Sequence, residues 1–284
     1  MTITFRVTVL RSGEVILLDT RERILPVERA QSLEDYLVYL KHLALYRFAA
    51  RYAAQKCVLD LGCGEGYGSD ALAHTAHFVV AADHNVEVVM HARQKYARAN
   101  LAFVVCDAQA LPFRATSFAT VVSFEVIEHI PNVRRYLEEI ARVSATRGVV
   151  LLSTPNRVLR LLPFQKPWNR FHLREYDARG LARAVRAVFP RAQMLGIAAT
   201  PPILEIEKQR VKQNPFVAYP KMLAQLFIPR AVYEWLKARR APRVETARST
   251  PFDAARFSVD DFRISADGLR ECINLIAIGE KGTE

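Results

Sequence analysis

Three aspartates stand where short apolar runs of the chain end, and the first of them precedes a turn rich in glycine. Asp60 comes just before Gly62 and Gly64, while Asp83 and Asp107 follow two later runs. Glycine lets the backbone turn tightly and lets a ligand approach it closely. A carboxylate beside such a turn would repel a pyrophosphate and would attract a ligand that carries positive charge. The pattern therefore predicts a site for a cationic ligand.

The same acids indicate the rest of that ligand. Asp83 is placed to accept hydrogen bonds from both hydroxyls of a ribose. Asp107 can accept a hydrogen bond from an adenine amino group, and the main-chain N–H of Ala108 beside it can serve a ring nitrogen. A dinucleotide fits less well, because the sixth position counted from Gly62 is Tyr67 and not the glycine of the dinucleotide fingerprint. We therefore expect a ligand that contains adenosine.

A second group of side chains could move a proton. Glu125, Glu128 and His129 follow the fourth apolar run, and His172 follows the fifth. The ordinary pKa of histidine, about 6.5, suits a general base at neutral pH. His129 is therefore our first candidate for the base, with Glu128 and His172 as further candidates. The alternative is that Glu128 and His129 only fix their loop or hold one end of the ligand.

A metal site is a further alternative for this group. Glu125, Glu128 and His129 have the spacing of one helix face, and His172 could add a fourth ligand. Pro131 follows two residues after His129 and would interrupt such a helix. We therefore expect no metal in this protein.

These groups need a sheet whose strand ends meet at one edge. From residue 57 onward, apolar runs alternate with helical patterns, which indicates parallel strands joined by right-handed crossovers. Ser32, Asn85, Asn132 and Asp177 each precede a helical pattern as N-caps. The predicted strands are 58–61, 78–82, 102–105, 120–123, 149–153, 194–198 and 273–278. The fold class is therefore α/β, with a doubly wound, mostly parallel sheet of seven strands.

Together these segments resemble the successive motifs of class I, Rossmann-like S-adenosylmethionine (SAM)-dependent methyltransferases. The resemblance covers about residues 40–198 and the last strand. It implies one antiparallel strand in the sheet, and SAM as the co-substrate that donates the methyl group. The residues that we expect around SAM are Asp60, Gly62, Cys63, Gly64, Tyr67, Asp83, His84, Asp107, Ala108, Phe124 and Glu125.

A narrower resemblance concerns the acceptor. Residues 21–26, 42–49, 154–157 and 171–176 are similar to bacterial methyltransferases of surface-glycan and other small-molecule biosynthesis. This resemblance implies a small or glycan-type acceptor, methylated on oxygen by direct displacement. Residues 200–248 depart from those proteins, so the acceptor itself is not assigned.

The chain is expected to divide into four segments. Residues 1–55 form an N-terminal arm, with a hairpin-like pattern, and a helix on the acceptor side. Residues 56–199 form the SAM-binding core. Residues 200–262, which are rich in proline and lack the strand–helix alternation, form a basic helical cap. Residues 263–284 complete the sheet with its last strand.

The positive charge of the chain is regional. Residues 157–248 hold 19 Lys/Arg and 6 Asp/Glu, whereas the rest holds 21 and 23. A basic segment on a nearly neutral core predicts an anionic partner at one face, which we take to be the acceptor. Apolar and basic residues interleave around Trp235. They could form a lid, a peripheral membrane contact, or a helix packed on the core or on a second subunit.

Two other functions use the same residues. The two glutamates and two histidines are similar to the pattern of metal-dependent RNA 2′-O-methyltransferases of small-RNA pathways, and the basic segment could bind RNA. An aromatic-rich RNA-binding module is missing from the sequence, and nothing in it indicates DNA. The second alternative is a SAM-fold protein that binds a ligand without turnover.

Composition is that of a globular chain, with 51% apolar residues. No apolar run is long enough to span a bilayer, and the N-terminus lacks the core of a signal peptide. The four cysteines stand in or beside apolar runs without metal-ligand spacing. We therefore expect buried thiols and a cytoplasmic location. The sequence indicates no particular oligomeric state.

Overall fold

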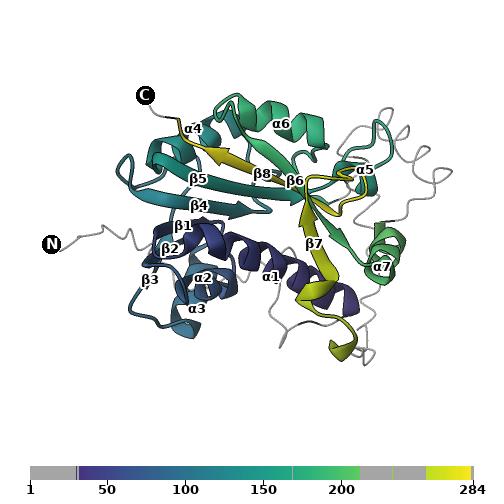
Figure 1. Ribbon diagram of the computed structural model, residues 1–284, viewed down its shortest axis with the longest axis horizontal. Helices are drawn as coiled ribbons and strands as arrows, with labels where there is room; N and C mark the ends of the chain where they lie inside the picture. Colours follow the sequence, from purple (N-terminus) through teal and green to yellow (C-terminus); the bar gives the residue numbers. More distant parts are fainter. Residues whose placement is uncertain (1–29, 31, 168, 212–231, 233–253, 283–284) are drawn as a thin grey trace.

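The computed structural model describes residues 32–167, 169–211 and 254–282, together with Ala30 and Val232. One sheet with the strand order β3-β2-β1-β4-β5-β8-β6-β7 carries the fold (Figure 1). Its strands are β1 (Cys57–Leu61), β2 (Phe78–Asp83), β3 (Leu101–Val105), β4 (Phe118–Phe124), β5 (Ser144–Pro155), β6 (Gln193–Ala199), β7 (Phe262–Ser265) and β8 (Asn274–Glu280). The helices are α1 (Leu33–Ala53), α2 (Tyr67–Ala73), α3 (Val86–Lys95), α4 (Val133–Val143), α5 (Arg157–Arg160), α6 (Ala178–Arg186) and α7 (Pro201–Val211).

The strand pairing follows from the connections. Strands β1 to β5 pair in parallel and are joined by crossover connections. Their carboxyl ends therefore lie at the same edge of the sheet. Strand β8 lies between β5 and β6 and runs antiparallel to both. Strand β7 pairs antiparallel with β6 at the outer edge. The predicted doubly wound, mostly parallel sheet is thus confirmed.

Helices cover both faces of the sheet. Successive side chains of a strand point to opposite faces, so Val58 packs in the same cluster as α1 and α2, whereas Leu59 packs with α4 and α6. Figure 1 shows α1 and α2 on one side of the sheet and α4 and α6 on the other. Strands that are buried on both faces explain the continuous apolar runs of the sequence.

The predicted N-caps position four of these helices. Ser32 accepts a hydrogen bond from the main-chain N–H of Asp35 at the start of α1. Asn85, Asn132 and Asp177 likewise accept from the first turns of α3, α4 and α6. Each cap satisfies a donor that has no partner within its helix.

The number of strands differs from the expected seven. Strand β7 adds an eighth, and it runs antiparallel like β8, so two strands oppose the parallel set instead of one. It has four residues and follows a short 3-10 turn at Val259–Asp261. A run of four residues gives too few alternations to stand out as a strand in the sequence. The last segment of the chain therefore supplies two strands.

Parts of the expected division lie outside the described residues. These are the N-terminal arm and most of the basic cap, including the apolar and basic stretch around Trp235. Of the cap, the structure describes α7, which contacts α1 and β6 and buries Ile203, together with the 3-10 turns that precede β7.

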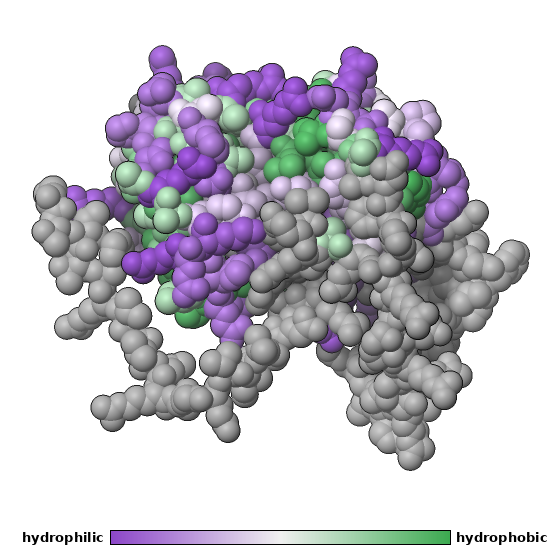
Figure 2. Space-filling view, turned by 90° about the horizontal axis from the view of Figure 1, so that it is seen from below, coloured by the Kyte–Doolittle hydropathy of each residue, from purple (hydrophilic) through white to green (hydrophobic). Residues whose placement is uncertain are grey.

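The surface seen from the side of α1 and α2 is mainly hydrophilic in the described part, with hydrophobic side chains in small groups (Figure 2). Within that part of the chain, no helix is both long and apolar enough to cross a membrane.

The expectation of four buried thiols is wrong for Cys57, which is exposed at the start of β1, and Cys106 is half-buried.

Candidate functional site

A cleft of about 950 Å³ opens over the carboxyl ends of the parallel strands. The last residues of four strands line it: Leu61, Asp83, Phe124 and Pro155. Crevices at this edge are where open α/β sheets bind ligands. Residues of α1 and of the segment 169–172 also line the cleft.

The glycine turn after β1 forms part of the cleft wall. Gly62 and Gly64 have φ angles of +83° and +51°, in the left-handed region that glycine adopts without strain. The main-chain N–H groups of Gly62 and Cys63 both donate to the carbonyl of Ala82, which fixes the turn to β2. A Cβ at Gly62 would lie 2.2 Å from a methyl group of Val126, whereas a Cβ at Gly64 would meet no atom within 4 Å. The open side of the turn can therefore receive a ligand.

Asp83, the last residue of β2, lies in the lining of the cleft. Its carboxylate accepts hydrogen bonds from the main-chain N–H groups of Gly64 and Asn85, at 3.1 and 2.9 Å. The imidazole of His84 lies 3.2 Å from it. Burial by itself raises the pKa of Asp83, but the hydrogen bonds from His84, Asn85 and Gly64 outweigh it and hold the pKa below its usual value. The group is therefore ionised and can accept hydrogen bonds from a ligand.

Asp107 lies at the end of the cleft beyond β3, beside Ala108 and Gln109. Its carboxylate accepts a hydrogen bond of 2.8 Å from the main-chain N–H of Gln109. Strands β2 and β3 are neighbours in the sheet, and both Asp83 and Asp107 line the cleft.

Asp60 lies deeper than expected. Its carboxylate is fully buried and is not part of the cleft lining. The hydroxyl of Tyr46 donates to it at 3.2 Å, and that of Ser69 at 2.6 Å. Burial raises the pKa of Asp60 to about 7 against the lowering effect of these two hydrogen bonds. Tyr46, which does line the cleft, stands between Asp60 and the ligand space.

Glu125 lies in an ion-pair cluster with residues far away in the sequence. Its carboxylate is 2.7 Å from the Lys41 ammonium and 3.4 Å from a His42 ring nitrogen, and it accepts a hydrogen bond from the amide of Asn274. Burial raises the pKa of Glu125, but the charges of Lys41 and His42 outweigh it and hold the pKa well below its usual value. Its φ of +56° lies in the left-handed region, which is incompatible with a regular α-helix at this residue.

Tyr67 connects this cluster to the glycine turn. Its hydroxyl lies 3.1 Å from the other ring nitrogen of His42, and its ring packs edge-on against Tyr46. Both tyrosines and His42 line the cleft. Burial lowers the pKa of His42 against the raising effect of Glu125, and the imidazole forms part of the polar wall of the cleft.

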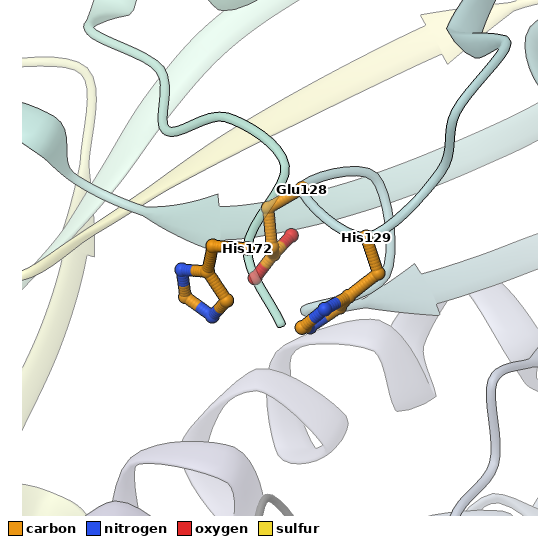
Figure 3. A group of neighbouring side chains, drawn as sticks. All are labelled: Glu128, His129 and His172. Atoms are coloured by element: carbon orange, nitrogen blue, oxygen red, sulfur yellow. The ribbon is translucent and has the colours of Figure 1, made fainter. Parts of the chain in front are cut away.

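Glu128, His129 and His172 form a separate group, which we call the trio (Figure 3). One ligand atom from each lies within 4.8 Å of the others. Figure 3 shows the carboxylate of Glu128 between the two imidazoles. The segment that holds Glu128 and His129 is a turn and not a helix, so Glu125 does not share a face with them. The sequence predicted that Glu128, His129 and His172 could act together, and the structure places them together. The shared helix face that the spacing suggested for Glu125 does not form.

Each member of the trio is held by a neighbour. His129 Nδ1 lies 3.1 Å from the carbonyl oxygen of Phe171, and His172 Nδ1 lies 2.8 Å from a carboxylate oxygen of Glu175. The carboxylate of Glu128 accepts a hydrogen bond of 3.0 Å from the hydroxyl of Thr154 through Oε2. Burial, with the charge of Glu125 second, raises the pKa of Glu128 well above its usual value.

A buried ion pair contacts the trio through His172. The guanidinium of Arg160 lies 3.2 Å from the carboxylate of Glu175, which also holds His172. Arg160 lines the cleft, and so does the exposed Arg170. Two cations of the basic segment therefore face the same end of the cleft as the trio.

Known proteins with similar sequences identify the family. A family model described as a methyltransferase domain matches residues 59–152. A Mycobacterium tuberculosis protein named "Probable S-adenosylmethionine-dependent methyltransferase" is 33% identical over 197 residues, which cover 69% of this chain and 70% of that protein. The chain belongs to the SAM-dependent methyltransferases.

Further relatives agree with this family. A Mycolicibacterium smegmatis protein, also described as a probable SAM-dependent methyltransferase, is 35% identical over 179 residues, covering 63% of this chain and 67% of that protein. A mitochondrial ubiquinone biosynthesis O-methyltransferase of Arabidopsis thaliana is 32% identical over 106 residues, covering 36% of this chain and 33% of that protein.

Solved structures show the same fold at low identity. The [4+2]-cyclase SpnF is 17% identical with a TM-score of 0.51, covering 84% of this chain and 81% of that one. The YcgJ protein of Bacillus subtilis is 18% identical with a TM-score of 0.50, covering 86% of this chain and 100% of that one. The class I methyltransferase fold is thus confirmed.

SAM is the co-substrate of this methyltransferase. The cleft fits it, because the glycine turn leaves open space beside Gly64 and because the ionised Asp83 lies in the middle of the lining. Sequence reasoning missed the roles of Lys41, Tyr46 and Asn274, which reach the site from elements far away in the chain. No local pattern marks such contacts.

Proposed function

We propose that this methyltransferase transfers the methyl group of SAM to an oxygen of a small or glycan-type, anionic acceptor, and that His129 accepts the acceptor's proton. SAM supplies an activated methyl group on a sulfonium, which is a good leaving group. The chain then has to align the acceptor and remove one proton.

SAM would lie along the strand ends. We propose that Asp83 accepts the ribose hydroxyls and that Asp107 and Ala108 contact the adenine. Gly62, Cys63 and Gly64 would pack against the middle of the molecule, with His84 beside the ribose. Phe124, Tyr67 and Glu125 line the end of the cleft next to α1, where the methionine part would lie.

The hydrogen bond between His129 and Phe171 is the observation that carries the role of His129. A carbonyl oxygen can only accept, so Nδ1 carries the proton of the neutral ring and Nε2 is its basic nitrogen. The residue lines the cleft at the end where the acceptor would bind. In this proposal Glu128 and His172 shape that end of the site.

The anionic character of the acceptor rests on the cations of the same region. The exposed Arg170 lines the cleft, as does Arg160, whose charge is paired with Glu175, and both belong to the segment 157–248 that holds the positive excess of the chain. Methylation on an oxygen atom is supported by the relative named a ubiquinone biosynthesis O-methyltransferase.

An RNA 2′-O-methyltransferase is the second candidate function, because the trio brings together three groups that could hold a metal. The fourth residue of that pattern, Glu125, is bound to Lys41 and Asn274. This pairing favours the small acceptor.

The test is the His129→Ala variant, assayed for methyl transfer and for SAM affinity in the presence of EDTA. We expect the wild-type protein to stay active with the chelator. The variant should lose activity and keep the wild-type dissociation constant for SAM. Wild-type activity that disappears with EDTA and returns with Mg²⁺ or Mn²⁺ would favour the RNA candidate instead.

A further inference from the structure

The trio of Glu128, His129 and His172 joins one carboxylate and two imidazoles from two separate loops (Figure 3). We propose that the trio is a binding site for a divalent transition-metal ion such as zinc. Imidazole nitrogen and carboxylate oxygen are ligands that such ions prefer, and two histidines with one glutamate make a common zinc set.

The carboxylate of Glu128 is the first observation that points to an ion. The residue is fully buried, and its Oε2 accepts the hydrogen bond from Thr154. Its Oε1 has no hydrogen-bond partner although it is inaccessible to solvent. A buried polar atom without a partner costs about 1–3 kcal/mol, and more when it is charged. A cation between the side chains of the trio would satisfy this oxygen.

The outer contacts of the two histidines are the second observation. A histidine that binds a metal through one ring nitrogen commonly donates the N–H of the other nitrogen to a carbonyl or a carboxylate. His129 makes this contact with the carbonyl of Phe171, and His172 makes it with Glu175. Both contacts use Nδ1 and so fix the orientation of each ring. Arg160 in turn holds Glu175.

The spacing is close to what an ion needs. Zinc–ligand bonds of about 2.0–2.2 Å place the ligands of a tetrahedral site about 3.4 Å apart. The ligand atoms of the trio lie within 4.8 Å of one another, so a closure of at most about 1.4 Å would complete the set. Both imidazoles line the cleft, which leaves further coordination positions on the side of the acceptor.

Metal binding has a consequence that rests on the proposed function. An ion held by the trio takes the ring nitrogen of His129 that would otherwise accept the acceptor's proton. Zinc should therefore inhibit methyl transfer, and a chelator should restore it. The ion would thus regulate the site without being needed for the reaction.

The experiment titrates the chelator-treated full chain with Zn²⁺ by calorimetry and with Co²⁺ by visible absorption. We expect one ion per chain, with d–d absorption bands of Co²⁺ bound by nitrogen and oxygen. Glu128→Gln and His172→Gln should each weaken binding about tenfold or more, because each removes a ligand. His77→Gln, which changes an exposed histidine outside the trio, should bind like the wild type.

Circular dichroism and SAM affinity show whether each variant is folded. Absence of saturable binding to the folded wild type would overturn the metal site, and so would equal binding by the wild type and both folded trio variants. The activity assay tests the proposed function separately. If zinc binds to the trio and activates a chelated, inactive protein, then the metal site stands and the role of His129 as a base fails.

Discussion

The Tyr46 hydroxyl donates a hydrogen bond to the buried carboxylate of Asp60, at 3.2 Å from each of its oxygens. This contact joins α1 to β1 directly beneath the cleft, and the ring of Tyr46 forms part of the cleft wall. The carboxylate therefore holds a tyrosine of the cleft wall in position.

Asp60 should make the stability of the protein depend on pH. Its pKa is raised to about 7 in the folded state against 3.8 for the free group, because burial disfavours the ionised form. The folded state then binds more protons than the unfolded state, so this contribution falls as the pH rises towards 7. We expect a loss of about 3 kcal/mol between pH 5 and pH 8.

Chemical denaturation of the wild type and of Asp60→Asn, each at several pH values, measures this effect. The asparagine cannot ionise, so only the wild type should lose this stability as the pH rises to 7. We therefore expect the unfolding free energy of Asp60→Asn to increase relative to that of the wild type over this range. A difference that stays constant with pH would show that Asp60 has an ordinary pKa.

Two glycines of the turn should respond differently to alanine. At Gly62 the new Cβ would lie 2.2 Å from Val126, whereas at Gly64 it would meet open space. Both positions carry the left-handed backbone cost of about 1–2 kcal/mol. Gly62→Ala should therefore lower the melting temperature more than Gly64→Ala does. Equal melting temperatures would mean that Val126 moves away without cost.

Asp83→Ala should weaken SAM binding about tenfold or more, because hydrogen bonds to a charged acceptor contribute about 1.5–3 kcal/mol. Isothermal calorimetry with SAM measures the change. Asp83→Asn is the comparison variant, since it keeps the shape of the side chain without the charge, and its single acceptor oxygen can serve only one of the N–H groups of Gly64 and Asn85, which donate to different oxygens of Asp83. Unchanged affinity in both variants would limit Asp83 to holding the glycine turn.

Arg170→Ala should raise the Michaelis constant of an anionic acceptor several-fold at low salt and less at high salt. The side chain is exposed, and exposed charges contribute on the order of 0–1 kcal/mol that salt reduces. SAM affinity should not change. Arg191→Ala is the control, because this exposed arginine lies outside the cleft lining. Equal effects of the two substitutions would remove Arg170 from acceptor recognition.

The local features of this fold could be predicted from the sequence because short-range contacts determine them. Ser32 and Asn132 cap their helices as expected, through main-chain N–H groups within three residues. The ends of the parallel strands bring Asp83 and Asp107 together by topology alone. Strand β7 was missed because four residues carry little periodicity.

Contacts between distant residues could not be predicted in the same way. Lys41 and Asn274 are 84 and 149 residues away from Glu125 along the chain, and their pairing depends on how α1 and β8 pack. The spacing of Glu125, Glu128 and His129 indicated a shared face because a helix was assumed. The backbone turns at Glu125 instead, and His172 arrives from another loop.

Product identification tests the central claim most directly. The purified protein is incubated with methyl-labelled SAM and a fractionated cell extract, with and without ribonuclease, and the labelled products are analysed by mass spectrometry. We predict a small, anionic product that carries one added methyl group on oxygen, survives ribonuclease and is absent with His129→Ala. Label confined to ribonuclease-sensitive material, or no label although SAM binds, would contradict the proposal.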